Sequence, residues 1–230
     1  MFRTIVFSAF GAGIAVCLSV SALQTVTTEP LILHAEEFEG QAPPVHDHRA
    51  PAVNERQHDA AALAPSDGLE RIAFTVLANL VVGVAVSLML LGFMVLKGDP
   101  IDARRGLLWG LGGFIAASLL PSLGLPPELP GTPAAEILSR QVWWVATAIA
   151  SAGGIGLLVF GRQWWRMALG LVVIVVPHVI GAPAPPSDEV SYPGALAGEF
   201  VVASMVVSAL LWSMAGAASG WLHQRLTANA

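Results

Sequence analysis

Residues 72–96 read IAFTVLANLVVGVAVSLMLLGFMVL, a stretch without a charged side chain. A helix of about 20 mostly apolar residues crosses a hydrocarbon core of about 30 Å, so this stretch predicts a transmembrane helix. Further apolar stretches are interpreted in the same way, and the fifth span is the shortest. The predicted spans cover residues 5–25, 72–96, 106–125, 141–160, 167–182 and 198–221. The sequence therefore predicts an all-α integral membrane protein, a bundle of about six transmembrane helices with one long extracytoplasmic loop.

The composition of the whole chain agrees with a single membrane domain over residues 1–230. Of these 230 residues, 55% are apolar and only 12% are charged, whereas about 25% are charged in an average soluble domain. The 11 Lys and Arg residues form no block, which argues against a nucleic-acid partner. Membrane lipid is the expected surrounding.

Motifs of common enzyme classes are absent from the sequence. It contains no Gly-x-x-x-x-Gly-Lys-Ser/Thr loop, no His-Glu-x-x-His pair and no Gly-x-Ser-x-Gly elbow. Cys17 is the only cysteine, so an intrachain disulfide and a thiolate zinc cluster are excluded. We expect no enzymatic activity and no resident cofactor.

The first apolar stretch has an alternative interpretation as a cleaved signal peptide. Arg3 precedes it, and Val20, Ser21 and Ala22 offer small residues for a cleavage site. The apolar stretch is longer than the usual signal core of about 7 to 15 residues. We therefore favour a retained helix.

A polar segment over residues 26–71 separates the first two spans. It is rich in His and acidic residues and contains prolines at positions 43, 44, 51 and 65. Such a composition predicts an extended or partly disordered loop. Two proline-rich breaks, at 126–131 and 182–189, interrupt the chain further on, because proline lacks a donor and fixes the backbone.

The distribution of positive charge predicts the orientation. Short cytoplasmic loops carry an excess of Lys and Arg. Seven of the 11 cations fall in the N-terminus, the 97–105 loop, the 161–166 loop and the C-terminus, namely Arg3, Lys97, Arg104, Arg105, Arg162, Arg166 and Arg225. We expect a multi-pass protein of the inner membrane, with both termini cytoplasmic and the 26–71 loop outside.

Histidines and carboxylates gather in the predicted outer loop. The candidate metal ligands there are His34, Glu36, His46 and His48. Imidazole and carboxylate suit divalent cobalt, nickel, zinc or manganese, and two histidines one residue apart can approach one ion when the chain is extended. The alternative is that they are solvated polar residues of a flexible loop.

A second group of candidates lies at the predicted outer ends of the spans. His178 follows Pro177 near the end of an apolar helix, and an ionisable group at membrane depth usually faces a bundle interior or cavity. Its alternative role is a neutral histidine bonded to a neighbouring helix. Glu199 could instead be an interfacial carboxylate at a helix N-terminus. We interpret His178, Glu128 and Glu199 as a site that receives metal.

Neighbouring residues have predicted structural roles. Arg140 could pair with Glu128 or with Glu136, and Trp143 and Trp144 are interpreted as an interface belt. Glycines four residues apart let helix backbones approach closely in lipid. The pairs in question are Gly106/Gly110, Gly194/Gly198 and Gly216/Gly220.

Short motifs along nearly the whole chain resemble those of one family. They are PLIL at 30–33, HDH at 46–48, DGLER at 67–71, RGLLWG at 105–110, GLPPELPG at 124–131, RQVWW at 140–144 and PHVIGAP at 177–183. Together they resemble the CbtA family of proposed cobalt transporter subunits. The resemblance implies transport of Co²⁺ and a small, histidine-containing one-helix partner, CbtB. A different possibility is a non-transporting scaffold that delivers metal to another permease.

Overall fold

The computed structural model describes residues 2–41, 68–187 and 189–228, and this part of the chain is all helical apart from its connections. The prediction of an all-α membrane protein is confirmed. The helices are α1 (Phe2–Val26), α2 (Thr28–Gln41), α4 (Leu69–Lys97), α5 (Ala103–Phe114), the π-helical turn η1 (Ile115–Leu119), α6 (Leu120–Ser122), α7 (Ile137–Phe160), α8 (Trp164–Ile180) and α9 (Gly194–Ala228).

The six predicted spans correspond to six helical segments, which differ in length and in hydropathy. Four helices, α1, α4, α7 and α9, are long and apolar enough to cross a membrane. The third predicted span is the continuous run α5–η1–α6 over residues 103–122. Its π turn ends at Leu119, two residues before Pro121, which has no N–H and whose ring would clash with the carbonyl four residues earlier. The fifth is α8, an apolar helix of 17 residues.

Glycine contacts hold α5 against α9. A Cβ on Gly106 would overlap the carbonyl oxygen of Gly216, and a Cβ on Gly110 would overlap that of Trp212. Gly220 approaches the carbonyl of Asp102 in the same way. Close packing is therefore confirmed for the pairs on α5 and near the end of α9. It is wrong for the third pair, Gly194/Gly198, where an added Cβ would meet nothing within 4 Å.

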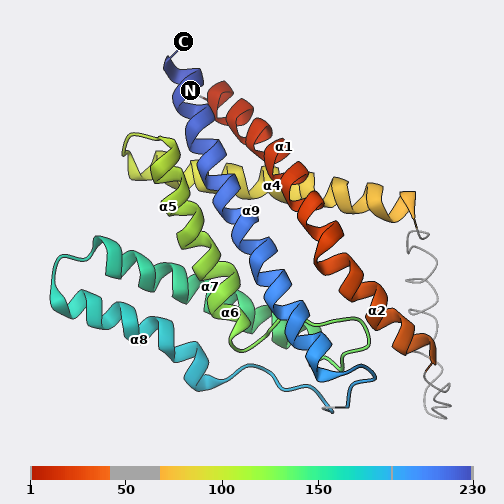
Figure 1. Cartoon of the computed structure of the whole chain (residues 1–230). Coiled ribbons are helices and arrows are strands. Elements are labelled where there is room, and N and C mark those ends of the chain that lie inside the picture. Colours follow the sequence, from red (N-terminus) through yellow and green to blue (C-terminus); the bar gives the residue numbers. More distant parts are fainter. Residues whose placement is uncertain (1, 42–67, 188, 229–230) are drawn as a thin grey trace.

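Helices α1, α4 and α9 enclose the main hydrophobic core. Its buried members are Ala9, Val16, Val20, Leu90, Leu91, Met94, Val207, Trp212 and Ala215. Asn79 of α4 adds a polar link to α1, because its Nδ2 donates to Ser21 Oγ at 2.9 Å and to Gln24 Oε1 at 2.7 Å. Figure 1 shows α1 and α9 side by side, with α4 crossing them.

The expectation of an extended loop from residue 26 onward is wrong for residues 28–41, which form α2. All four prolines used for that prediction come after this segment, and Pro30 is tolerated because it lies in the first turn of the helix. Leu31, Ile32, Ala35 and Phe38 pack in a second hydrophobic cluster with residues of α9 and of the proline-rich break. This burial explains why the segment is helical, since packing stabilises a short helix. Leu69–Arg71 likewise already belong to α4.

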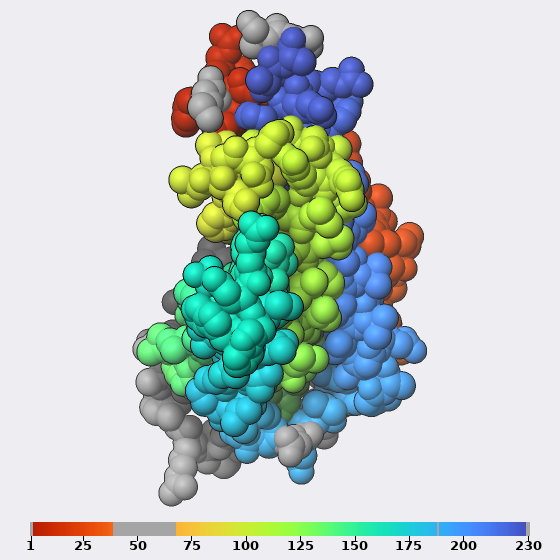
Figure 2. Space-filling view, turned by 90° about the vertical axis from the view of Figure 1, so that its left-hand side faces the viewer, coloured from red at the N-terminus to blue at the C-terminus, as the bar shows by residue number. Residues whose placement is uncertain are grey.

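The two termini lie at one end of the molecule, together with the turn between α4 and α5 (Figure 1). The α1–α2 extension, the proline-rich break after α6 and the start of α9 lie at the other end. Figure 2 shows α5 between the α7–α8 hairpin and α9. Among the described elements, α8 packs only against α7, and α7 reaches the other helices mainly through η1 and α6.

Candidate metal-transport site

A pocket of about 760 Å³ lies where the α7–α8 hairpin meets the rest of the protein. Residues of η1, α6, the proline-rich break, α7 and α9 line it. Its polar lining consists of Ser118, Ser122, Glu128, Arg140, Gln141 and Ser208. The thioether of Met205 and the ring of Trp144 complete the wall. The pocket is thus lined by residues with oxygen atoms and by one residue with a soft sulfur atom, which are types of ligand that divalent metals use.

Glu128 and Arg140 form an ion pair in this pocket. Arg140 Nη2 donates to Glu128 Oε2 at 2.6 Å, and the two side chains are 29% and 26% exposed. Of the two partners that the sequence allowed for Arg140, the structure selects Glu128. Glu136 instead caps α7, accepting from the backbone N–H groups of Leu138 and Ser139 at 3.0 and 2.8 Å.

Hydrogen bonds keep Glu136 ionised in its capping role. The Ser139 hydroxyl, followed by the backbone N–H groups, holds the pKa of Glu136 below its usual value. A charged carboxylate at a helix N-terminus also complements the helix dipole. This cap fixes the first turn of α7, and Arg140 follows it by one turn.

His178 lies against Trp143 at the C-terminal end of α8. The rings meet edge to face at 5.9 Å and 72°, and Trp143 Nε1 donates to the Pro177 carbonyl oxygen at 3.3 Å. Nε2 of His178 is buried and has no hydrogen-bond partner among the described residues. A buried polar nitrogen without a partner is rare in native structures and calls for an explanation.

The two adjacent tryptophans differ in their surroundings. Trp144 is 43% exposed and agrees with the predicted interface belt, whereas Trp143 is 8% exposed. The belt interpretation is therefore wrong for Trp143. A Cβ on Gly124 would lie 2.5 Å from the Trp143 ring, so the tryptophan fills the space between the chain after α6 and the end of α8.

Of the candidate ligands that the structure describes, Glu128 lines the pocket, whereas His178, His34, Glu36 and Glu199 do not. Glu36 accepts two hydrogen bonds from Arg71, at 2.6 and 3.1 Å, which tie α2 to α4. His34 is exposed, with its ring 5.3 Å from that of Phe38. Glu199 is exposed on α9. His46 and His48 lie outside the described residues.

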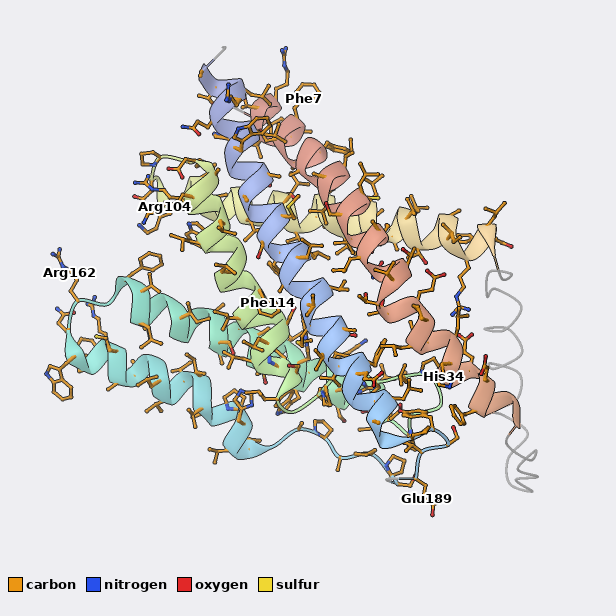
Figure 3. All side chains as sticks on the ribbon, in the orientation of Figure 1. Phe7, His34, Arg104, Phe114, Arg162 and Glu189 are labelled. Carbon is orange, nitrogen blue, oxygen red and sulfur yellow. The ribbon has the colours of Figure 1, made fainter. Side chains whose placement is uncertain are left out.

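Over residues 2–41, 68–187 and 189–228, no group of three or more His, Cys, Asp and Glu side chains is placed to hold a metal ion. Metal binding by the predicted ligands stays a prediction. Within the described chain, each candidate is instead paired with an arginine, exposed, or buried without a partner. Figure 3 shows His34 at the end of the molecule opposite to Phe7 and Arg104.

Sequence reasoning missed two buried hydroxyls on α7. Thr147 and Ser151 are fully buried, and their hydroxyl oxygens lack a hydrogen-bond partner in the described structure. With Trp143 they follow one another at intervals of four residues, which places them on one face of the helix. This spacing could have predicted their burial from the sequence, since polar side chains on one face of an apolar membrane helix usually point toward the bundle interior.

Comparison with known proteins identifies the family. The searches of curated proteins and of solved structures found no match. The family model described as "Probable cobalt transporter subunit (CbtA)" matches residues 2–224, nearly the whole chain. The glycine contacts, the Glu128–Arg140 pair and the Trp143–His178 contact all fall within this match. The chain belongs to the CbtA family of probable cobalt transporter subunits.

Proposed function

We propose that this protein is the membrane subunit of a cobalt uptake transporter that captures the ion on the outer face and passes it through the helix bundle. The observation that carries the proposal is the buried Nε2 of His178, which has no partner among the described residues. A neutral imidazole nitrogen with a free lone pair is a good ligand for Co²⁺. Its place near the end of an apolar helix fits a residue on an ion path.

The outer face would be the end that carries α2 and the two proline-rich segments. His34, Glu36, Glu128 and Glu199 belong to elements at that end (Figures 1 and 3). His46 and His48 follow α2 in the sequence and would concentrate the ion before it reaches His178. Carboxylates and imidazoles on one face attract cations by their charge and by their ligand chemistry.

The topology that this function requires has both termini in the cytoplasm of an inner-membrane protein. Single cysteines placed at position 46 and near Arg104 should react with an impermeant reagent from outside and from inside the cell, respectively. Labelling of position 46 from the cytoplasmic side would contradict the proposed capture step.

Cobalt is the cargo in this proposal, and its selection cannot rest on affinity alone. Nickel and copper bind the same ligands more tightly in the usual order for divalent metals. Geometry and a partner subunit would have to select cobalt, and a small one-helix CbtB-like chain is the expected partner. No enzymatic step is part of the proposal.

The experiment that tests the proposal measures uptake of Co²⁺, Ni²⁺, Zn²⁺ and Mn²⁺ in cells that express the chain with and without the small partner. We expect Co²⁺ uptake above that of cells lacking the chain, and loss of this uptake in His178→Gln. The second candidate function is a non-transporting metal-delivery scaffold. It is favoured if the purified chain and partner bind Co²⁺ but move none into liposomes.

A further inference from the structure

We propose that the guanidinium of Arg140 is a tethered cation that occupies the Glu128 carboxylate when no metal is bound. An incoming divalent ion displaces the guanidinium from this carboxylate. The inference rests on the proposed function and names how one of its ligands is regulated. It starts from a contrast between the Glu128–Arg140 pair and the Glu36–Arg71 pair.

The Glu128–Arg140 pair leaves one carboxylate oxygen open. Arg140 uses a single bond to Oε2, and no other hydrogen bond reaches the Glu128 side chain in the described part of the chain. The Glu36–Arg71 pair engages both carboxylate oxygens of Glu36. Bidentate pairing is the strong and geometrically specific form of this interaction. Oε1 of Glu128 therefore accepts no hydrogen bond from Arg140 and has both lone pairs left for a cation, whereas each oxygen of Glu36 already accepts a hydrogen bond from Arg71.

The surroundings of the two pairs differ as well. Glu128 and Arg140 both line the pocket of about 760 Å³, and among the described residues that line it they are the only ones with charged side chains. Glu36 and Arg71 do not line it. Ser118, Ser122 and Ser208 also line the pocket, and in this proposal their hydroxyl oxygens are the acceptors for the displaced guanidinium and further ligands for the ion.

In the Glu128–Arg140 pair, the positive charge of Arg140 balances the negative charge of Glu128. A lone carboxylate at the edge of an apolar bundle would be costly, because an unpaired charge in a poorly solvated site loses hydration energy without compensation. Arg140 supplies the compensating positive charge while no metal ion is bound. The same charge competes with Co²⁺ for Glu128, which weakens binding and favours release of the ion along the path.

The test measures Co²⁺ binding to the purified full-length chain in nanodiscs, with Co²⁺ alone as the probe and equilibrium dialysis as the readout. Removal of the competing charge in Arg140→Gln should tighten binding by about tenfold. Glu128→Gln should weaken it by about tenfold, and the double variant should bind like Glu128→Gln. Arg162→Gln removes one positive charge from an exposed residue outside the pocket lining; it is the control and should change binding by less than about twofold.

Two further variants separate competition from a purely structural pair. Arg140→Lys keeps the positive charge and should bind Co²⁺ as weakly as the unmodified chain. Arg140→Met keeps much of the side-chain length and replaces Arg140→Gln if that variant does not fold. The inference is overturned if removal of the charge leaves the affinity unchanged or weakens it, or if Arg140→Lys binds as tightly as Arg140→Gln. In that case Co²⁺ uptake by the unmodified chain would leave the proposed function standing, whereas absence of both binding and uptake would overturn the proposed function itself.

Discussion

The helices α1, α4, α5 and α9 differ from the α7–α8 hairpin in how they are held. The first group shares a continuous core and has backbone contacts at Gly106 and Gly110 that leave no room for a side chain. The hairpin reaches this group through η1, α6, the Glu128–Arg140 pair and the clamped Trp143. Buried polar atoms without a partner occur in both regions of the described chain: Ser87, Ser219 and His223 belong to the first group, and Thr147, Ser151 and His178 belong to the hairpin. One region therefore supplies a closely packed frame, and the other supplies His178 and Arg140, the groups that our proposals assign to metal transport.

Breaking the frame should have the largest effect. Gly106→Val places a branched side chain against the Gly216 carbonyl, and neither backbone can move without separating α5 from α9. We expect a loss of about 3 kcal/mol of folding free energy, seen as a lower melting temperature and aggregation in detergent. Gly153→Ala on α7 is the control, because nothing lies within 4 Å of its added methyl group. Equal melting temperatures for the two variants would show that the glycine contact is not part of the frame.

Removing the hairpin's free imidazole should abolish transport and leave the frame intact. His178→Gln keeps a polar side chain that can donate a hydrogen bond, but its amide is a poor metal ligand. We expect Co²⁺ uptake to fall by at least about tenfold, with normal membrane insertion and melting temperature. His223→Gln, in the last turns of α9 at the opposite end, is the control and should transport normally.

The pH dependence sharpens the same comparison. Protonation of an imidazole removes the lone pair that binds metal, so protons compete with Co²⁺. Uptake by the unmodified protein should decrease as the outside medium becomes more acidic, and His178→Gln should lose this response. A variant with normal uptake and an unchanged pH profile would show that His178 is structural.

Loosening the hairpin without removing a ligand should give a smaller effect. Trp143→Phe keeps an aromatic ring but loses the hydrogen bond to the Pro177 carbonyl and part of the packing against Gly124. We expect a cost of about 1–2 kcal/mol in stability and a several-fold decrease in uptake. Trp164→Phe should change neither quantity, because Trp164 is 80% exposed and lies outside the pocket lining. If both variants behave alike, the buried tryptophan does not position His178.

The smallest effect should come from His46 and His48, which belong to neither region. Replacing both with alanine should weaken uptake only at limiting Co²⁺, since a ligand that raises the local ion concentration matters little once the ion is abundant. The sequence predicts that both residues lie in a solvated loop, so the melting temperature should stay within about 1 °C of the unmodified value. Unchanged uptake at the lowest Co²⁺ concentration would show that the pair is dispensable.

The apolar spans could be predicted because hydropathy over about 20 residues reports the solvent of a helix directly. The helix over residues 28–41 could not, since its stability comes from packing against Leu196 and Phe200, far away in the sequence. Similarly, Trp143 and Trp144 are neighbours in the sequence, and the packing of Trp143 against Gly124, Pro177 and His178, all distant in the sequence, separates the buried ring from the exposed one. The choice between Glu128 and Glu136 as partner of Arg140 depended on which of them capped α7.

The π turn at Ile115–Leu119 has a consequence for the register of its helix. A turn of this kind carries one extra residue, so the chain beyond it is rotated by roughly 100° relative to an unbroken helix. Gly106 and Gly110 keep the earlier phase and face α9. Ser118 stands in the turn itself, where it both accepts a hydrogen bond from Trp212 Nε1 and lines the pocket, and Ser122 lines the pocket just beyond it. A deletion of one residue in this turn would therefore change what the pocket presents to an ion while every pocket residue kept its identity.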